Sequence, residues 1–269
     1  MEALYHLGFG DVSGAKYAIL PGDPGRVEQI AALLDNPRFL NQNREYNAWL
    51  GEIEKQTVLV MSTGMGGPST AIAVEELTQC GIETFVRIGT CGGMAEKAMT
   101  TDLVIATGAI RQDGTSKEYV PVEFPAIADL AVTNALIQAA KKTTDDIKRE
   151  RESGATQSAV ALPKWHAGVV QSKDSYYGQH EPERMPIGNK LTEKYQAWIK
   201  AGCLASEMEC SSLFIVAQTL GVRAGAILSV IWNQERFLKK LYNYKSMDTS
   251  LAIKTSVEAV RILIKNDIG

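Results

Sequence analysis

Six short runs of almost unbroken apolar, mostly β-branched residues recur along this chain, and they limit its fold more than any other feature. A strand that is apolar on both faces has to be covered on both faces. The runs are 17–20, 58–61, 85–88, 103–106, 168–171 and 226–230. Amphipathic stretches with helical periodicity lie between and after them, at 25–34, 69–80, 127–142, 206–220 and 249–264. This alternation predicts an α/β fold of three layers, in which helices sandwich a mixed, largely parallel central sheet.

The composition excludes several classes of protein. The chain has 269 residues, of which 45% are hydrophobic and 22% charged, as in an average globular domain. Its net charge of only −3 argues against disorder and against nucleic acid as the main partner. The N-terminus lacks the basic and apolar segments of a signal peptide, and no apolar run could cross a bilayer. We therefore expect a cytoplasmic protein that has no membrane partner.

Two further expectations concern the organisation of the chain. The four cysteines show no metal-type spacing, which predicts reduced and mostly buried thiols. The polar stretch 141–155 is expected to be a helix end followed by a surface loop. It is too short for an interdomain linker, so residues 1–269 are expected to form a single domain.

Two of the expected strands end in glycine-rich turns that lead into helices. The first turn carries Gly22 and Arg26, and the second covers residues 62–70. Glycine lets an anion approach the backbone amides, and an arginine one turn further on can donate to that anion. Each turn alone is also what a tight strand-to-helix connection requires. Neither turn matches a P-loop or a dinucleotide-binding fingerprint.

Arg87 lies inside an otherwise apolar strand, shortly before Thr90. A buried guanidinium is costly unless an anion accompanies it. That anion is either a carboxylate of the protein, such as Glu75 or Glu76, or a phosphate held jointly with Thr90 and the first glycine turn.

Glu207 and Glu209 flank Met208, next to small apolar residues. Carboxylates two positions apart point away from each other, so they do not form a glycosidase-type acid/base pair. One of them could instead accept hydrogen bonds from the hydroxyls of a ribose, with the methionine as an apolar floor. The alternative is an ordinary helix start with exposed acidic residues.

Taken in this order, these segments resemble the hexameric type of the nucleoside phosphorylase superfamily, and within it the uridine phosphorylases. The resemblance covers nearly the whole chain, and its strongest blocks are PGDPGRV at 21–27, NREY at 43–46, STGMGGPST at 62–70, RIGT at 87–90 and EME at 207–209. It implies the nucleoside phosphorylase fold. It also implies reversible phosphorolysis of uridine to uracil and ribose 1-phosphate, a step of pyrimidine salvage, with phosphate as co-substrate and no required cofactor. Phosphate would attack through an oxocarbenium-like transition state.

The resemblance further implies residues for each part of the site. For phosphate they are Gly22, Arg26, Arg87, Thr90 and, from a neighbouring subunit, Arg44. For ribose they are Glu207, Met208, Glu209 and, from across a dimer interface, His6. In this family a monovalent cation, usually potassium, can sit at that interface, and the matching ligands are Glu45, Ser69 and the backbone of Met65. The implied assembly is a homodimer with shared active sites, built into a hexamer.

The base-binding segment matches the family pattern less closely. The implied residues are Tyr176, Gln179, Arg184, Ile231 and Trp232. The family reads uracil with a Gly-Gln-x-Arg segment, whereas here the arginine follows Gln179 by five residues. Lys173 or His180 could therefore replace Arg184. Catalysis is expected to rest on Arg87, Glu209 and Gln179, and Arg87→Ala is expected to abolish most turnover while the fold stays intact.

Asn233 bears on the choice of base. Purine phosphorolysis benefits from an acid that protonates N7, and purine-specific relatives carry Asp at this position, whereas an amide cannot act as a general acid. Uracil needs no such proton, because fixed donors can stabilise the charge on its carbonyl oxygens. The alternatives are a purine nucleoside phosphorylase or nucleosidase of the same fold and, in another class, a non-catalytic nucleoside-binding protein.

Overall fold

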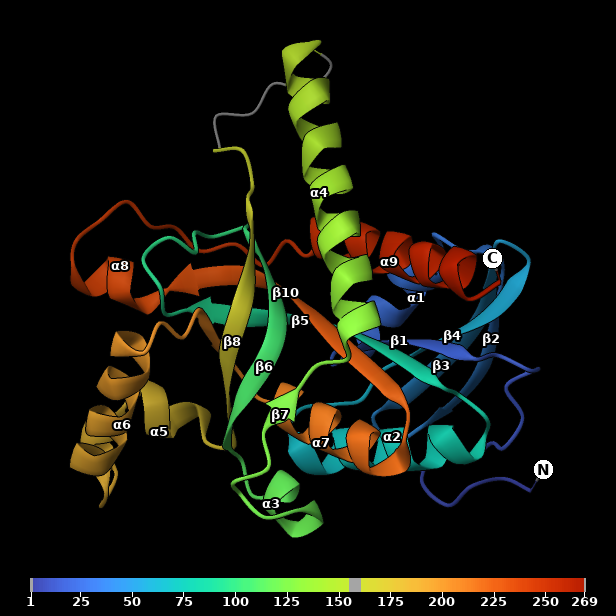
Figure 1. Cartoon of the computed structure of the whole chain (residues 1–269), viewed down its shortest axis with the longest axis horizontal. Helices are drawn as coiled ribbons and strands as arrows, with labels where there is room; N and C mark the ends of the chain where they lie inside the picture. The colour runs from blue at the N-terminus through green and yellow to red at the C-terminus, as the bar shows by residue number, and fades with distance from the viewer. Residues whose placement is uncertain (1, 155–160, 269) are drawn as a thin grey trace.

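The computed structural model describes residues 2–154 and 161–268. A mixed sheet of ten described strands has helices on both faces (Figure 1), so the predicted α/β class is confirmed. The strands are β1 (Tyr17–Pro21), β2 (Asp35–Asn43), β3 (Tyr46–Ile53), β4 (Gln56–Met61), β5 (Thr84–Gly93), β6 (Leu103–Gln112), β7 (Ala126–Ile127), β8 (Trp165–Lys173), β9 (Ala205–Glu207) and β10 (Arg223–Asn233). The helices are η1 (Pro24–Arg26), α1 (Val27–Ala31), α2 (Gly67–Gln79), α3 (Thr115–Tyr119), α4 (Leu130–Glu152), α5 (Tyr176–His180), η2 (Pro182–Arg184), α6 (Gly188–Lys200), α7 (Cys210–Leu220), α8 (Gln234–Leu238) and α9 (Ser250–Ile268).

The centre of the sheet is parallel. β4, β1, β5 and β10 lie side by side in the same direction, and β3 and β2 extend the β4 edge in antiparallel fashion. β10 also pairs with β6, and the pairings β6–β8, β8–β9 and β9–β5 lead back to β5, so these five strands close into a ring. The carboxyl ends of β1, β5 and β10 therefore meet at one edge, which is where α/β proteins commonly bind their ligands.

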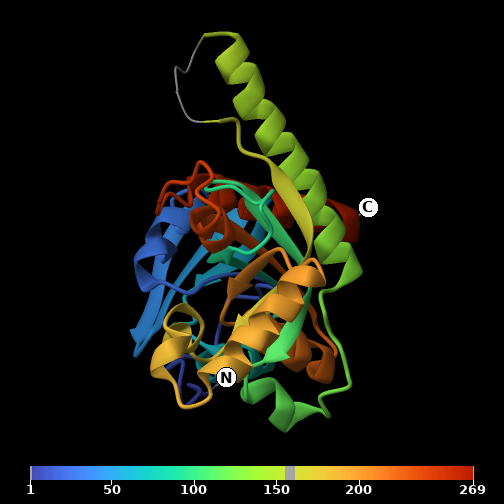
Figure 2. The same ribbon diagram turned by 90° about the vertical axis from the view of Figure 1, so that its left-hand side faces the viewer.

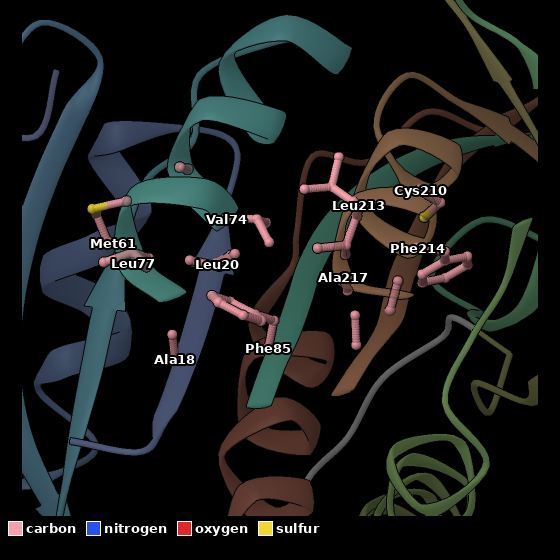
Figure 3. Close-up of a cluster of buried hydrophobic side chains, with 14 of the residues drawn as sticks. Ala18, Leu20, Met61, Val74, Leu77, Phe85, Cys210, Leu213, Phe214 and Ala217 are labelled. Carbon is pink, nitrogen blue, oxygen red and sulfur yellow. The ribbon is translucent and has the colours of Figure 1, made fainter. Parts of the chain in front are cut away.

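Alternation along the central strands divides the core into two halves. Ala18 and Leu20 of β1 point to the half covered by α2 and α7, whereas Tyr17 and Ile19 point to the half covered by α1, α4 and α9. Figure 3 shows the first half, in which side chains of β1, β4 and β5 meet those of α2 and α7. Each fully buried large apolar side chain contributes about 1.5–3 kcal/mol. Burial on both faces explains why the apolar runs predicted strands correctly: all six lie within observed strands.

The polar stretch 141–155 differs from its prediction. α4 continues through most of it to Glu152, and its outer part projects from the body (Figure 2). Contact with α9 reaches the level of Thr143, whose hydroxyl lies 2.8 Å from that of Thr255. Beyond that level, ion pairs at helical spacing, such as Arg149–Asp146 at 2.5 Å, support the helix. Residue 155 lies outside the described residues.

Other expectations stand as follows. All four cysteines are free thiols and three of them are buried, as predicted. Among the described helices, none is both long and apolar enough to cross a membrane. The organisation of residues 1–269 as a single domain stays a prediction.

Candidate active site

A cleft of about 800 Å³ opens where the carboxyl ends of β1, β5 and β10 meet. Its walls come from the turns after β1 and β4, from the ends of β5 and β10, from β9 and from α5. The predicted residues that line it are Gly22, Arg26, Met65, Arg87, Thr90, Tyr176, Gln179, Glu207, Met208, Glu209, Ile231 and Trp232. The fold thus brings residues predicted for phosphate, ribose and base into one space.

Arg87 lies buried at the floor of this cleft, on β5. Its Nη2 donates to Glu209 Oε2, and its Nε is 3.6 Å from Glu207 Oε2. Burial alone would lower the pKa of Arg87, but Glu209 and Glu207 outweigh burial and raise it. A carboxylate partner was one of the two alternatives for Arg87, yet the candidates Glu75 and Glu76 are wrong, because neither pairs with it.

Two nitrogens of Arg87, Nε and Nη1, are buried and make no hydrogen bond, although Nε lies on the side of Glu207. Nη1 lies beside the first glycine turn, 3.7 Å from the place that a Cβ on Gly22 would take. Arg26 faces the same region. Burial lowers its pKa and nearby Arg87 lowers it further, although Asp23 opposes this. Two neighbouring arginines and an unused, buried Nη1 group at a glycine turn are the kind of donors that a multiply charged anion requires.

β9 and the start of α7 position the two carboxylates of the Glu-Met-Glu segment. The hydrogen-bonding capacity of Glu207 is used within the protein. Its carboxylate accepts hydrogen bonds from the backbone amides of Glu209 and Cys210, at 2.8 and 3.0 Å, and from the hydroxyl of Ser172. Glu209 accepts from the backbone N–H of Gly66 at 2.7 Å and pairs with the guanidinium described above. Both carboxylates are buried, so the alternative of exposed acidic residues is wrong. Glu209 has fewer protein donors and is the better placed acceptor for a ligand hydroxyl.

Gly66 makes that contact possible. It follows β4 and has φ 97°, a conformation that L side chains rarely adopt. Its amide can therefore turn towards Glu209 at the point where the turn passes into α2.

α5 forms the base-side wall of the cleft. Gln179 Oε1 accepts from Ser206 Oγ at 2.7 Å, and Ser206 Oγ accepts in turn from Lys173 Nζ at 2.6 Å. Lys173 is 4% exposed, and burial lowers its pKa to about 8 although Glu207 acts in the opposite sense. Its ammonium also lies 6.0 Å from the ring centroid of Tyr176. At neutral pH a positive charge therefore stands beside the wall that would face the base.

The comparison with known proteins agrees with this geometry. The Phosphorylase superfamily model matches residues 16–243. This chain belongs to the phosphorylase superfamily. It is 48% identical to the uridine phosphorylase of Treponema pallidum, over 98% of this chain and 95% of that protein. It is 40% identical to the uridine phosphorylase of Salmonella typhimurium, over 97% and 98%. It is also 39% identical to the guanosine phosphorylase of Halorubrum lacusprofundi, over 83% and 80%.

Some predicted residues lie outside the cleft of this phosphorylase superfamily member. Arg184 is exposed in the short helix η2, where it pairs with Glu181 and lies 5.9 Å from the ring centroid of Tyr177. The five-residue spacing after Gln179 carries it past the cleft, so the loop does not fold it back onto the base.

His6 and Arg44, the residues expected from a neighbouring subunit, also lie outside the cleft of their own chain. His6 Nδ1 is 2.6 Å from Glu76 Oε1, at the surface of α2. Arg44 is exposed at the turn between β2 and β3, with φ 52°, and makes no ion pair within the described part of the chain.

The residues matched to a cation site cluster around Gly64 of this phosphorylase superfamily member. A Cβ on Gly64 would lie 2.8 Å from Glu45 Cγ and 3.4 Å from Ser69 Oγ. Ser69 Oγ donates to the carbonyl of Met65 at 3.4 Å. The cluster offers a carboxylate, a hydroxyl and a carbonyl, which are oxygen donors that suit a hard cation. Over residues 2–154 and 161–268, no group of three or more His, Cys, Asp or Glu side chains could hold a metal ion.

Nine lining residues are absent from the predicted site: Asp23, Pro24, Gly64, Gly89, Cys91, Gly92, Glu181, Ser206 and Lys245. Ser206 could have been suspected from its place next to Glu207. Lys245 follows α8 in an irregular segment, and no sequence signal marks it.

Proposed function

We propose that this protein catalyses the reversible phosphorolysis of uridine. The C1′–N1 bond breaks and its electron pair leaves with uracil, while a phosphate oxygen forms the new bond to C1′. The uracil anion then takes a proton from solvent, so the products are uracil and ribose 1-phosphate. The observation that carries the proposal is Arg87, which pairs with Glu209 on one side and keeps the unused, buried Nη1 group beside the Gly22 turn on the other.

In this proposal the protein acts by positioning and by electrostatics. Arg87, Arg26 and Thr90 hold phosphate, and Glu209 accepts from a ribose hydroxyl. Positive charge builds up on the ribose as the glycosidic bond stretches, and the adjacent phosphate dianion stabilises it. The fixed placement of phosphate below C1′ supplies the rest of the rate enhancement. No covalent intermediate with the enzyme is needed.

Lys173 stabilises the negative charge on the departing uracil. It is the cation in the base-side wall, whereas Arg184 lies outside the cleft. His180 lines the same wall, but burial and then Lys173 lower its pKa, which disfavours a charged imidazole there. Gln179 is held by Ser206, which leaves its amide N–H₂ free to donate to a carbonyl oxygen of the base.

Asn233 provides no acid for a purine base. Both of its Nδ2 hydrogens donate to backbone carbonyls, those of Ala95 and Ala98, each at 2.8 Å. Its Oδ1 accepts from the amide of Arg236 at 3.0 Å and so caps α8. The side chain is fully buried and does not line the cleft. This favours uridine over the purine substrate named for the Halorubrum relative.

The complete site contains two chains. Arg44 and His6 lie outside the cleft of their own chain, which supports a role for them in the site of a second copy. We expect a homodimer with shared sites, assembled into a hexamer, and a potassium ion held by Glu45, Ser69 and the Met65 carbonyl between the two copies. The ion would supply charge balance and rigidity at that interface. A cytoplasmic location likewise stays a prediction.

An ultraviolet assay of base release tests the proposal. Uridine, thymidine, inosine and guanosine are each incubated with the protein, with and without phosphate. Uridine should be consumed only when phosphate is present. Phosphate-dependent loss of inosine or guanosine without loss of uridine would indicate a purine phosphorylase, and loss without phosphate a nucleosidase. Binding of uridine without any turnover would indicate a non-catalytic protein.

A further inference from the structure

One buried carboxylate, that of Glu76 on α2, binds the N-terminal segment of the chain. His6 Nδ1 lies 2.6 Å from Glu76 Oε1, and the backbone N–H of Leu7 donates to Oε2 at 2.9 Å. The backbone N–H of His6 lies 3.1 and 3.2 Å from the same two oxygens. Three N–H groups of two adjacent residues therefore share one side chain of α2.

This contact determines which nitrogen of His6 carries a proton. Burial raises the pKa of Glu76, but the hydrogen bonds from Leu7 and His6 outweigh burial and lower it, so the carboxyl group is ionised. A carboxylate can only accept, and the proton between the two groups therefore belongs to His6 Nδ1. In the neutral imidazole, Nε2 is then the acceptor.

That acceptor is open to a group from outside the chain. Over residues 2–154 and 161–268, the ring of His6 makes its hydrogen bond through Nδ1 and none through Nε2. The side chain of His6 is 34% exposed, whereas that of Glu76 is 11% exposed. Glu76 thus holds His6 from the protein side and leaves the far nitrogen of the ring for another molecule.

The backbone of the segment is held from β2. Asn43 Nδ2 donates to the carbonyl of His6 at 2.8 Å, and Asn41 Nδ2 donates to the carbonyl of Leu7 at 3.0 Å. Asn43 directly precedes Arg44. The end of β2 therefore fixes both residues that are expected to reach the site of a second copy. The orientation of the His6 ring is left to Glu76.

We propose that Glu76 is a positioning residue for the ribose: it holds the His6 ring so that Nε2 accepts from the 5′-hydroxyl of a nucleoside in the site of a second copy. This inference rests on the proposed function, because it requires uridine in that site. Glu209 lies beside Arg87, at the phosphate end of the cleft, and serves a hydroxyl on the ribose ring. The 5′-hydroxyl stands on the exocyclic carbon, and no residue of the chain's own cleft is assigned to it.

The test compares uridine with 5′-deoxyuridine, which lacks that hydroxyl, in the wild type and in Glu76→Gln. Glutamine keeps the size of the side chain but offers one acceptor oxygen to three N–H groups, and its own amide N–H₂ faces one of them. For uridine, kcat/KM should fall about fivefold, as for the loss of one neutral hydrogen bond. For 5′-deoxyuridine it should change by less than about twofold. A merely structural role of Glu76 would lower both values by the same factor.

Glu75→Gln is the matched control, because Glu75 is the preceding residue of α2 and accepts from the hydroxyl of Tyr119 at 3.1 Å. It should keep both values of kcat/KM. His6→Ala should show the same selective loss as Glu76→Gln, and the double variant should lose no more than His6→Ala alone. If Glu76→Gln is not folded, Glu76→Asp replaces it, because aspartate keeps both oxygens but is too short to reach Nδ1.

Nitrogen-15 NMR of histidine-labelled protein gives a readout that does not depend on turnover. The chain has three histidines, and His6→Ala identifies the signals of His6. In the wild type, neutral His6 should be protonated at Nδ1 and unprotonated at Nε2. In Glu76→Gln the population should shift towards the tautomer protonated at Nε2.

The inference is overturned if Glu76→Gln affects the two substrates equally, if it leaves uridine unaffected, or if the His6 tautomer is the same in both proteins. A loss in the double variant that exceeds that of His6→Ala would also contradict it. Wild-type turnover of uridine with phosphate is measured separately. Absence of that turnover would contradict the proposed function, whereas equal effects on the two substrates in an active enzyme would contradict only the role of Glu76.

Discussion

Replacing Arg87 by lysine keeps a positive charge beside two buried carboxylates but removes the planar fork of the guanidinium. Glu207 and Glu209 would retain a counter-charge, so the protein should still fold. Alanine is the less informative change, because leaving buried carboxylates unpaired costs about 3–5 kcal/mol. The expectation that Arg87→Ala leaves the fold intact is therefore corrected by the ion pairs that the structure places around this residue.

The magnitude follows from the unused donor of Arg87. Its Nη1 group is buried beside the Gly22 turn and makes no hydrogen bond, whereas Nε lies on the side of the guanidinium that Glu207 and Glu209 occupy. A hydrogen bond to a charged group contributes about 1.5–3 kcal/mol, so the contact of Nη1 with phosphate contributes that amount. The ammonium of lysine cannot pair with the two carboxylates and also reproduce this contact, since it lacks the planar guanidinium. The expected loss in kcat/KM for phosphate is roughly 10- to 10²-fold.

The assay is the phosphate dependence of uridine consumption, followed by ultraviolet absorbance. Arg223→Lys is the matched control. Arg223 is also an arginine of the sheet, but it lies at the start of β10, away from the cleft, and pairs with Asp267 at 2.5 Å. This control should keep kcat/KM for phosphate, and thermal melting should show that both variants are folded. If Arg87→Lys keeps kcat/KM for phosphate within about threefold of wild type, then Arg87 does not hold the anion and the assignment of the phosphate site is refuted.

Two other residues give separate predictions. In the wild type, kcat/KM for uridine should fall as the pH rises through about 8, because Lys173 then loses the proton that stabilises the departing base. Lys173→Met should have a low kcat/KM that does not fall further at alkaline pH. Lys148→Met, on the projecting part of α4, should keep the wild-type pH dependence. Asp113 is fully buried and accepts from the amide of Ser116 at 2.7 Å and from three serine hydroxyls, which together outweigh burial and lower its pKa. Asp113→Asn should therefore cost about 1–3 kcal/mol in urea unfolding at neutral pH. Because the pKa of Asp113 is lowered in the folded state, the wild type should have the larger free energy of unfolding above the ordinary pKa of 3.8, and this difference from Asp113→Asn should disappear as the pH falls through the folded-state pKa. A difference in unfolding free energy that stays the same at acid pH would contradict this account.

The sequence was most informative where burial is two-sided. Continuous apolar runs predict the central strands, because only a strand covered on both faces needs them. β2 carries no such signal: the segment Asp35–Asn43 is polar, contains Pro37 and is mostly exposed. It is a strand because β3 pairs with it, and β3 in turn is held by β4. Such a strand depends on partners that the local sequence does not reveal.

The same distinction applies to the site. The residues predicted for phosphate that line the cleft lie in short motifs, each within one turn or one strand, and most residues predicted for the base also line it. The link from Lys173 through Ser206 to Gln179 could not be predicted, because it depends on the pairing of β8 with β9, in which Gln171 lies opposite Ser206. Lys173 and Ser206 are 33 residues apart in the chain. The spacing of the motif left Arg184, Lys173 and His180 as alternatives, and strand register brings Lys173 to the cleft, whereas Arg184 lies outside it.

The position of Arg87 also explains how the two substrates can be coupled. Its Nη2 and Glu209 Oε2 now satisfy each other, and the second oxygen of Glu209 accepts from the amide of Gly66. In the proposed site, a phosphate bound to the free Nη1 group would share the charge of the guanidinium and weaken its hold on Glu209. The carboxylate would then become a stronger acceptor for a ribose hydroxyl, so phosphate would favour nucleoside binding. By linkage the nucleoside must favour phosphate binding by the same factor. A cleft organised in this way would select the ternary complex over a nucleoside bound alone, while the pairs with Glu207 and Glu209 offset the cost of burying Arg87 in the sheet.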